Sequence, residues 1–304
     1  MPNLLVADIG GTKIAAALAD VNGGIKHQIQ AKSAVHDSES MFESLCASFF
    51  ELLTHDGKKR EDINVIGLGV PGKVNPEKGI AIYQNNLPWR DFPLASRLKE
   101  VFPNAEVVID NDVYLAAYGE WQVRNLTQET FVYFTVSTGI SSCIINKGEF
   151  IRGAGMAGEV GLTILEINHP IKTLENLASG PAIEAEARGQ LQDPTITTKQ
   201  VMESYYQQDP QAIVIIKKSA KHIAHGLHQI FSIVDPHVIV IGGGVIHNQP
   251  VFLELIRAEL RELVQNPVQD GIFDRIHMSQ YKGEAGLQGA LHLAIKHNRK
   301  SSFA

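Results

Sequence analysis

The chain contains two copies of a short pattern in which two apolar strands flank a turn of glycine and threonine. The first copy spans residues 4–18 with the turn Gly10-Gly11-Thr12, and the second spans residues 131–145 with the turn Thr138-Gly139. Runs rich in Val, Ile and Leu on both sides of such a turn are typical of a β-hairpin, and glycine adopts backbone angles that other residues avoid. The duplication therefore predicts two related α/β halves.

The composition of the first turn suits an anionic ligand. Without bulky side chains, its backbone N–H groups and the Thr12 hydroxyl can approach a phosphate closely. Asp8, at the end of the preceding strand, can hold a hydrated Mg²⁺. One such hairpin alone is more often an ordinary structural turn, whereas two with a threonine in each favour a polyphosphate held from two sides.

The composition limits the classes of partner and compartment. With 304 residues, the chain is long enough for about two domains, and its net charge of -6 argues against a nucleic-acid partner. The sequence has no apolar run of membrane-spanning length, and Asp8 interrupts the apolar start that a signal peptide would need. The two cysteines, Cys46 and Cys143, are far apart, which favours a reducing cytoplasm over a disulfide framework.

Hydrophobic periodicity places further elements along the chain. A strand is expected at 25–29, and the helix that follows at 38–53 has Ser38 or Ser40 as its N-cap. The remaining predicted elements are strands at 63–70, 79–83 and 238–245, and helices at 93–101, 173–189 (interrupted at Gly180-Pro181), 197–206, 210–234, 250–264 and 285–297. Residues 148–161 are glycine-rich and too polar for a core.

Residues 67–72 match the dinucleotide-binding pattern GxGxxG by letter only. In that motif a helix must follow the glycines so that its N-terminus faces the pyrophosphate. Here the sequence after Gly72 predicts a turn and another strand, so the dinucleotide interpretation is rejected.

An acidic segment, Asp110-Asn111-Asp112, stands between a short strand at 107–109 and a helix that begins at 113. Ligands of open α/β sheets gather at the carboxyl ends of strands, and phosphoryl transfer to a hydroxyl needs a carboxylate that accepts its proton. Asp112 is the candidate for that carboxylate. From its position alone, a role as helix N-cap is the stronger alternative.

The segment from Asp8 to Lys13 resembles the first phosphate motif of the ROK sugar kinases, a family within the hexokinase, Hsp70 and actin superfamily, and 137–140 resembles the second. The resemblance implies an α/β fold of two actin-like, ribonuclease H-like domains with a cleft between them. The smaller domain is expected at 1–118 together with the helix at 285–304, and the larger at 119–284. ATP and Mg²⁺ are the implied cofactors.

The resemblance also assigns roles to individual residues. It implies that Asp112 is the catalytic base and that Asp8 holds the metal. The implied nucleotide-binding residues are Asp8, Gly10, Gly11, Thr12, Lys13, Thr138, Gly139 and Gly243, and the implied sugar-binding residues are Gly72, Asn86, Asn111, Glu159 and Glu175.

The chain departs from the family pattern near the sugar motifs. Leu162 stands where the family commonly has a histidine that binds sugar and zinc, and 168–173 contains no cysteine. A structural zinc needs four ligands, which His169 cannot supply alone. The sequence therefore resembles a member of the family without structural zinc.

The expected function is ATP-dependent phosphorylation of a primary hydroxyl of a hexose or an N-acetylhexosamine, with fructose or a β-glucoside as alternative substrates. The expected partner is a small-molecule sugar, with no nucleic acid or membrane, and a homodimer is expected. The family also includes sugar-responsive repressors. These carry a helix-turn-helix segment before the first phosphate motif, and only seven residues precede Asp8 here. A sugar-binding protein without catalysis is the third alternative.

Overall fold

The computed structural model describes residues 3–84, 87–281 and 283–301. The chain divides into two compact units, the first formed by Met1–Arg124 and Glu284–Ala304 and the second by Asn125–Gly283. This division between 124 and 125 comes a few residues after the domain boundary expected at 118/119, because the helix that contains residue 118 continues to Val123. Each unit has its own central sheet and its own hydrophobic packing.

The first unit is built on a mixed sheet with the strand order β3-β2-β1-β4-β8. Its first three strands are antiparallel, whereas β4 and β8 run parallel to β1. The expected hairpin is confirmed, since Ile9 and Ile14 form its last strand pair before the turn. The strands of this sheet are β1 (Asn3–Ile9), β2 (Lys13–Asp20), β3 (Ile25–Lys32), β4 (Ile63–Val70) and β8 (Glu106–Asn111).

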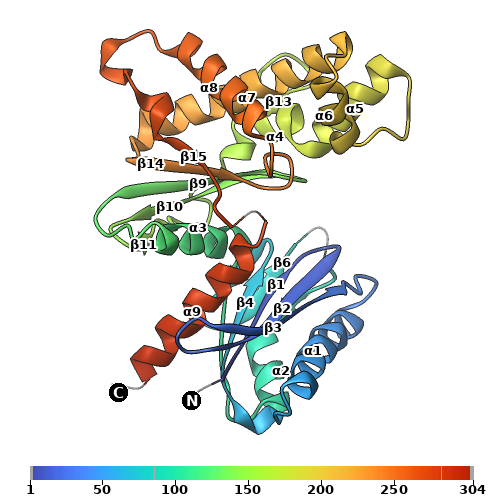
Figure 1. Ribbon diagram of the computed structural model, residues 1–304, viewed down its shortest axis with the longest axis vertical. Coiled ribbons are helices and arrows are strands. Elements are labelled where there is room, and N and C mark those ends of the chain that lie inside the picture. The colour runs from blue at the N-terminus through green and yellow to red at the C-terminus, as the bar shows by residue number, and fades with distance from the viewer. Residues whose placement is uncertain (1–2, 85–86, 282, 302–304) are drawn as a thin grey trace. The chain divides into compact units, whose positions relative to one another are not determined.

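Strand β1 is buried on both faces, and its alternating residues belong to two different cores. Leu5 and Ala7 pack in one cluster with residues of α1 and α2, whereas Leu4 and Val6 pack in another with residues of α3 and α9. Because successive side chains of a strand point to opposite faces, the unit has three layers, with the sheet between two pairs of helices (Figure 1). The helices are α1 (Ser38–His55), α2 (Leu94–Val101), α3 (Asp112–Val123) and α9 (Ala285–Ser301).

Two helix starts in this unit differ in detail from the sequence expectation. Asp37, rather than Ser38 or Ser40, caps α1, because its Oδ1 accepts a hydrogen bond from the Ser40 N–H at 2.8 Å. Asn111, rather than Asp112, caps α3. A small sheet with the order β5-β6-β7 follows β4, so no helix follows the glycines of 67–72. Its strands are β5 (Lys73–Asn75), β6 (Ile80–Tyr83) and β7 (Arg90–Phe92), and the loop before β4 contains a 3₁₀ turn, Arg60–Asp62.

The second unit repeats the topology of the first. Its sheet has the order β11-β10-β9-β14-β15, again with the first three strands antiparallel and the last two parallel to the hairpin strand that leads into the turn. This repetition confirms the predicted duplication. The strands are β9 (Thr130–Val136), β10 (Ile140–Asn146), β11 (Glu149–Phe150), β14 (Val238–Gly242) and β15 (Ile276–Met278).

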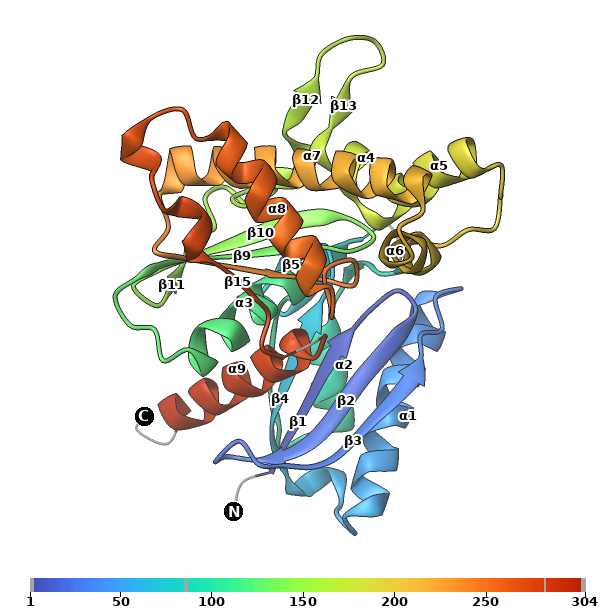
Figure 2. The same ribbon diagram turned by 45° about the horizontal axis from the view of Figure 1, so that its top comes forward.

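The long helix α7 organises the core of the second unit. Its apolar face packs together with Val132, Phe134 and Val136 of β9, and Figure 2 shows it lying across the sheet with the other helices around it. The helices are α4 (Leu174–Ala178), α5 (Gly180–Leu191), α6 (Thr198–Tyr206), α7 (Pro210–Val234) and α8 (Pro250–Leu263), and the 3₁₀ turns are Val160–Leu162, Pro267–Gln269 and Ile272–Arg275.

Several short strands were absent from the sequence prediction. They are β5, β7, β11, β15 and the hairpin of β12 (Ile164–Glu166) with β13 (Lys172–Thr173), which projects from the second unit in Figure 2. Each is at most three residues long, which is too short for an alternating pattern to be recognised.

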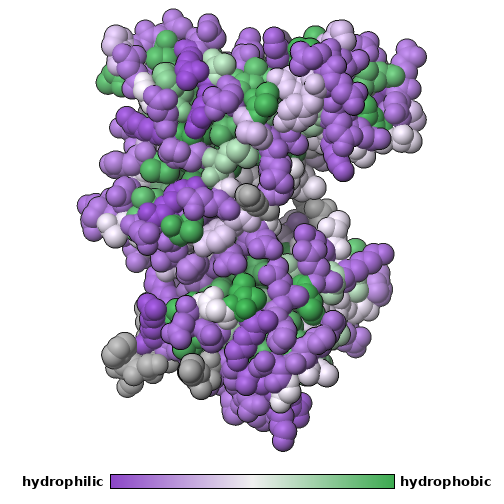
Figure 3. Space-filling model, in the orientation of Figure 1, coloured by the Kyte–Doolittle hydropathy of each residue, from purple (hydrophilic) through white to green (hydrophobic). Residues whose placement is uncertain are grey.

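On the face drawn in Figure 3, hydrophilic residues predominate and hydrophobic ones are scattered among them. Within the described ranges, no helix combines the length and the apolar character needed to cross a membrane.

Glycines let α9 approach its neighbours in the first unit at backbone distance. A Cβ on Gly289 would lie 1.8 Å from the Leu115 carbonyl oxygen of α3, and one on Gly67 would lie 2.6 Å from the Ala290 carbonyl oxygen of α9. Both contacts are with backbone atoms, so a side chain at either position would force the elements apart.

We therefore expect Gly289→Ala to destabilise the protein by about 1–3 kcal/mol or more, as overpacking does in other cores. Thermal unfolding of the purified variant measures this effect as a lower midpoint. Gly189→Ala is the matched control, because a Cβ on this helical glycine of α5 would have no atom within 4 Å; alanine there should be neutral or stabilising. An unchanged midpoint for Gly289→Ala would contradict the close approach of α9 and α3.

Candidate active site

Three parallel strand ends bring acidic residues together in the first unit. Asp8 of β1 pairs in register with Gly69 of β4, which pairs with Asp110 of β8, and Asp112 follows at the first position of α3. A Cβ on Gly69 would lie 3.2 Å from Asp8 Oδ1 and 3.7 Å from the Asp112 Cα. The structure thus brings together the predicted metal ligand and the predicted catalytic base.

The Asp8 carboxyl group is enclosed although the residue keeps some accessible surface. It continues the alternation of Leu4 and Val6, so it points to the face that α3 and α9 cover. Its Oδ2 lies 2.4 Å from the position of a Cβ on Gly286, in the first turn of α9. Desolvation, helped by the Asp112 charge, raises the pKa of Asp8 to about 7 against the lowering effect of Lys13. Only a glycine at position 286 leaves room for this carboxylate.

The first turn is held in a defined conformation. The Gly10 N–H donates to the Lys13 carbonyl at 2.9 Å, and Thr12 at the tip is exposed. Ser33, just after β3, donates from its N–H to the Thr12 carbonyl at 3.1 Å and from its hydroxyl to the Gly10 carbonyl at 2.6 Å. The sequence patterns gave no signal for Ser33, because its role depends on the β2–β3 register.

The Asn111 side chain links the start of α3 to Gly72, and both Asn111 and Gly72 are predicted sugar-binding residues. Its Oδ1 accepts from the N–H groups of Val113 and Tyr114, and its Nδ2 donates to the Gly72 carbonyl at 2.8 Å. The second Nδ2 hydrogen is the remaining donor of this side chain. Gly72 has a φ of +78°, and a Cβ there would lie 2.4 Å from the Tyr83 carbonyl oxygen. Asn86 lies outside the described residues.

Two predicted sugar-binding carboxylates lie beside the second turn, in the second unit. Glu175 Oε2 accepts from the Ile140 N–H at 2.8 Å, and a Cβ on Gly139 would lie 2.6 Å from the same oxygen. Glu159 Oε2 accepts from the Ser141 hydroxyl at 3.4 Å. The second unit therefore brings Glu159, Glu175 and the Thr138-Gly139 turn together.

The electrostatic setting of Glu159 differs from that of a simple surface acid. Its outer side is exposed, yet desolvation of the carboxyl group raises its pKa. The Ser141 hydrogen bond lowers the pKa, and the Glu175 charge raises it. Gly158 holds the loop of Glu159 against β10, because its φ is +91° and a Cβ would lie 2.1 Å from the Ser142 carbonyl oxygen.

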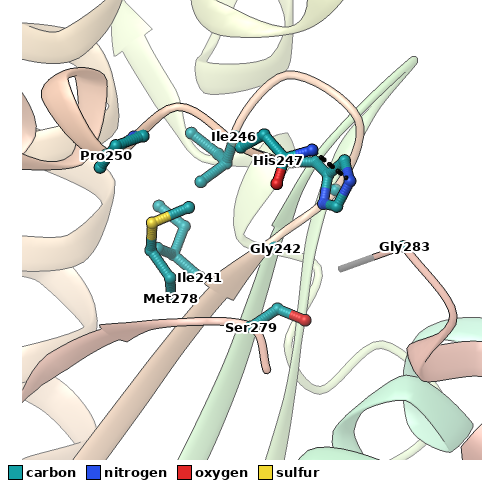
Figure 4. A pocket seen from close by; sticks show the side chains of 10 residues that line it. Ile241, Gly242, Ile246, His247, Pro250, Met278, Ser279 and Gly283 are labelled. Carbon is teal, nitrogen blue, oxygen red and sulfur yellow. Dashed lines mark hydrogen bonds between the residues drawn. The ribbon is translucent and has the colours of Figure 1, made fainter. Parts of the chain in front are cut away.

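The glycines after β14 lie next to the strand that leads into the second turn. Gly243 has a φ of +91°, and a Cβ there would lie 2.3 Å from the Val136 carbonyl oxygen. A cavity of about 310 Å³ opens beside them. Figure 4 shows Ile241, Ile246, Pro250 and Met278 around this cavity, with His247 and Ser279 as polar neighbours. An apolar cavity with a few polar groups is typical of a small-molecule site.

The residues around Asp8 fit a magnesium ion that takes most of its ligands from water and from a bound phosphate compound. Among the residues that the structure describes, no group of three or more His, Cys, Asp or Glu side chains could hold a metal ion by itself. Mg²⁺ usually takes one or two carboxylates together with waters and substrate phosphates. Asp8, with Asp112 nearby, would supply that protein contribution.

The repeated sheet topology and the site together define an α/β protein of the actin-like ATPase superfamily, with two ribonuclease H-like units. A sequence model described as the ROK family matches residues 5–297. The chain belongs to the ROK family.

Three relatives illustrate the similarity. The chain is 29% identical over 292 residues to a glucokinase of Halalkalibacterium halodurans, covering 88% of each chain. It is 28% identical over 300 residues to an N-acetylmannosamine kinase of Escherichia coli, covering 96% of this chain and 98% of that one. A ROK glucokinase of Streptomyces griseus, solved with glucose and AMPPNP, has a TM-score of 0.82 and 26% identity, with 97% and 99% of the two chains covered.

We expect Asp8→Asn to stabilise the metal-free protein at pH 8 but not at pH 4. A carboxyl group whose pKa is about 7 in the native state, against an ordinary value of 3.8, binds protons more tightly in the native state. Its contribution to stability is therefore lost as pH rises from about 4 to above 7. The measurement is thermal unfolding in the presence of a chelator, from pH 4 to pH 8. As the pH rises across this window, the unfolding midpoint of the variant should increase relative to that of the wild type.

Glu262→Gln is the control for the change of charge, because Glu262 is an exposed carboxyl group on α8. Its unfolding midpoint should follow the wild-type pH dependence. If the unfolding midpoint of Asp8→Asn also follows the wild-type pH dependence across this window, the claim that desolvation raises the pKa of Asp8 is wrong.

Proposed function

We propose that this protein transfers the γ-phosphoryl group of ATP to a primary hydroxyl of a hexose or an N-acetylhexosamine. The observation that carries the proposal is the pairing of Asp8 with Asp112 at the strand ends of the first unit. Two carboxylates in one desolvated site repel each other, and a site of this kind suits a cation and a proton transfer. Membership of the ROK family supports the same activity.

In this proposal Asp112 takes the proton of the sugar hydroxyl. The hydroxyl oxygen forms a bond to the γ-phosphorus, the bond from that phosphorus to the β–γ bridging oxygen breaks, and ADP leaves with the electron pair. Mg²⁺, when bound at Asp8, neutralises charge on the phosphates. Because the Gly10 N–H already donates to the Lys13 carbonyl, the N–H groups that follow it in the turn are assigned to phosphate oxygens, and the Lys13 ammonium adds positive charge.

The second unit is assigned the nucleotide base and much of the sugar. The cavity beside Gly242 and Gly243 has a size and an apolar lining that suit an adenine ring. Glu159 and Glu175 are suited to accept hydrogen bonds from sugar hydroxyls, since a carboxylate offers several acceptor sites. Thr138 and Gly139 are assigned to the phosphates.

The exposed side chain of Leu162 favours a sugar that carries an apolar substituent as the substrate. Its side chain is 53% exposed, and it follows Glu159 by one 3₁₀ turn, in which the Leu162 N–H donates to the Glu159 carbonyl at 3.1 Å. Covering such a side chain with an acetamido methyl group is favourable. N-acetylmannosamine, the N-acetylhexosamine in the name of the Escherichia coli relative, therefore comes first in the panel, followed by glucose, fructose and a β-glucoside.

The test is ADP formation across this sugar panel with wild type and Asp112→Asn. We expect the wild type to turn over at least one sugar, and the variant to lose about 10²- to 10⁴-fold in kcat, because general-base catalysis contributes that much. Glu77→Gln, an exposed carboxyl in the same unit, should retain wild-type kcat.

Three outcomes would contradict the proposal. Equal kcat for wild type and Asp112→Asn would remove Asp112 as the base. Tight sugar binding without turnover would indicate a binding protein, and sugar-dependent binding of DNA without turnover would indicate a regulator.

A further inference from the structure

Ser33 is a buried polar residue that the proposed chemistry does not use. It stands one residue after β3 and is only 5% exposed. Both of its hydrogen-bond donors are directed at the first turn, the hydroxyl to the Gly10 carbonyl at 2.6 Å and the N–H to the Thr12 carbonyl at 3.1 Å.

These two bonds fix the orientation of two peptide planes. In a planar trans peptide the C=O and the following N–H point in opposite directions. Because the Gly10 carbonyl points to Ser33, the Gly11 N–H points away from it. The Thr12 carbonyl also points to Ser33, so the Lys13 N–H likewise points away.

The hydrogen bond from the Ser33 hydroxyl to the Gly10 carbonyl does not follow from the strand register alone. The Ser33 N–H to Thr12 bond continues the β2–β3 ladder beyond its last pair, Lys13 with Lys32. The bond to Gly10 instead needs the Ser33 side chain. Without it, the peptide between Gly10 and Gly11 would lose its anchor, and flanking glycines restrict rotation least of all residues.

We propose that the Ser33 hydroxyl is a positioning group that presents the Gly11 N–H to an ATP phosphate. This inference rests on the proposed function, because it assumes that the first turn binds ATP. Ser33 itself does not touch the nucleotide; it acts through the peptide that it holds.

The experiment measures ATP affinity by titration calorimetry, and the KM values for ATP and sugar, in Ser33→Ala. Loss of one buried hydrogen bond that orients a ligand-binding group should raise the Kd and the KM for ATP about tenfold. The Kd for the sugar, measured without nucleotide, should stay within about twofold of the wild type. A general loss of packing would instead weaken both ligands.

Two further variants keep the test decisive. Ser48→Ala is the matched control, since Ser48 is 3% exposed and its hydroxyl donates to the Ser44 carbonyl at 2.9 Å within α1 of the same unit; ATP affinity should not change. Ser33→Cys keeps a side chain of similar size with a weaker hydrogen-bond donor. It replaces Ser33→Ala in the test if that variant does not fold. Its Kd for ATP should rise several-fold.

The outcomes separate this inference from the proposed function. If the wild type binds ATP and both Ser33 variants bind it equally well, the role of Ser33 is overturned while the kinase proposal stands. Parallel losses of ATP and sugar affinity would also overturn it, because they indicate a merely structural residue. If the wild type binds no ATP, the proposed function fails and this inference fails with it.

Discussion

The burial of the Asp8 carboxyl group beside Asp112 is the constraint on which the site in the first unit depends. Parallel pairing of β1, β4 and β8 brings the two residues to the same edge of the sheet, and the start of α9 closes over Asp8 at Gly286. Desolvation and the neighbouring charge raise the pKa of Asp8 to about 7, so the ligand-free site is electrostatically unfavourable at neutral pH. In the proposed function a divalent cation would relieve this repulsion, which links the stability of the site to its occupant.

Close helix packing is what makes this enclosure possible. Gly289 allows α9 to touch the backbone of α3, and Gly67 allows it to touch β4. Since α3 begins with Asp112, a displacement of α3 would alter the distance between the two carboxylates. A displacement of α9 would instead change the enclosure of Asp8 at Gly286. The glycines of 67–72, which match a dinucleotide fingerprint by letter, therefore have a packing role here. Gly67 faces α9, and Gly69 leaves space for Asp8.

The sequence predicted what is encoded locally and missed what depends on distant pairing. The two hairpins and the helices at 38–53 and 210–234 follow from periodicity and turn residues, and these predictions are confirmed within a few residues. The short strand β15 is defined by its partner β14. Ser33 is defined by the β2–β3 register, so no local pattern marks it. The roles of individual site residues came from the family resemblance, and they stay predictions.

The duplicated units differ at the strand position that Asp8 occupies in the first unit. Ile9 and Val136 each form the last pair of their hairpin, so Asp8 of the first unit corresponds to Thr135 of the second. Thr135 Oγ1 lies 2.7 Å from the position of a Cβ on Gly243, and it faces the glycine corner after β14. Each turn is nevertheless held by a residue far along the chain: Ser33 binds the Gly10 carbonyl, and the Gly180 N–H binds the Ser137 carbonyl at 2.8 Å. In the proposed function, the acidic strand end would hold the cation in the first unit alone, because Thr135 of the second unit offers a neutral hydroxyl where Asp8 offers a carboxylate.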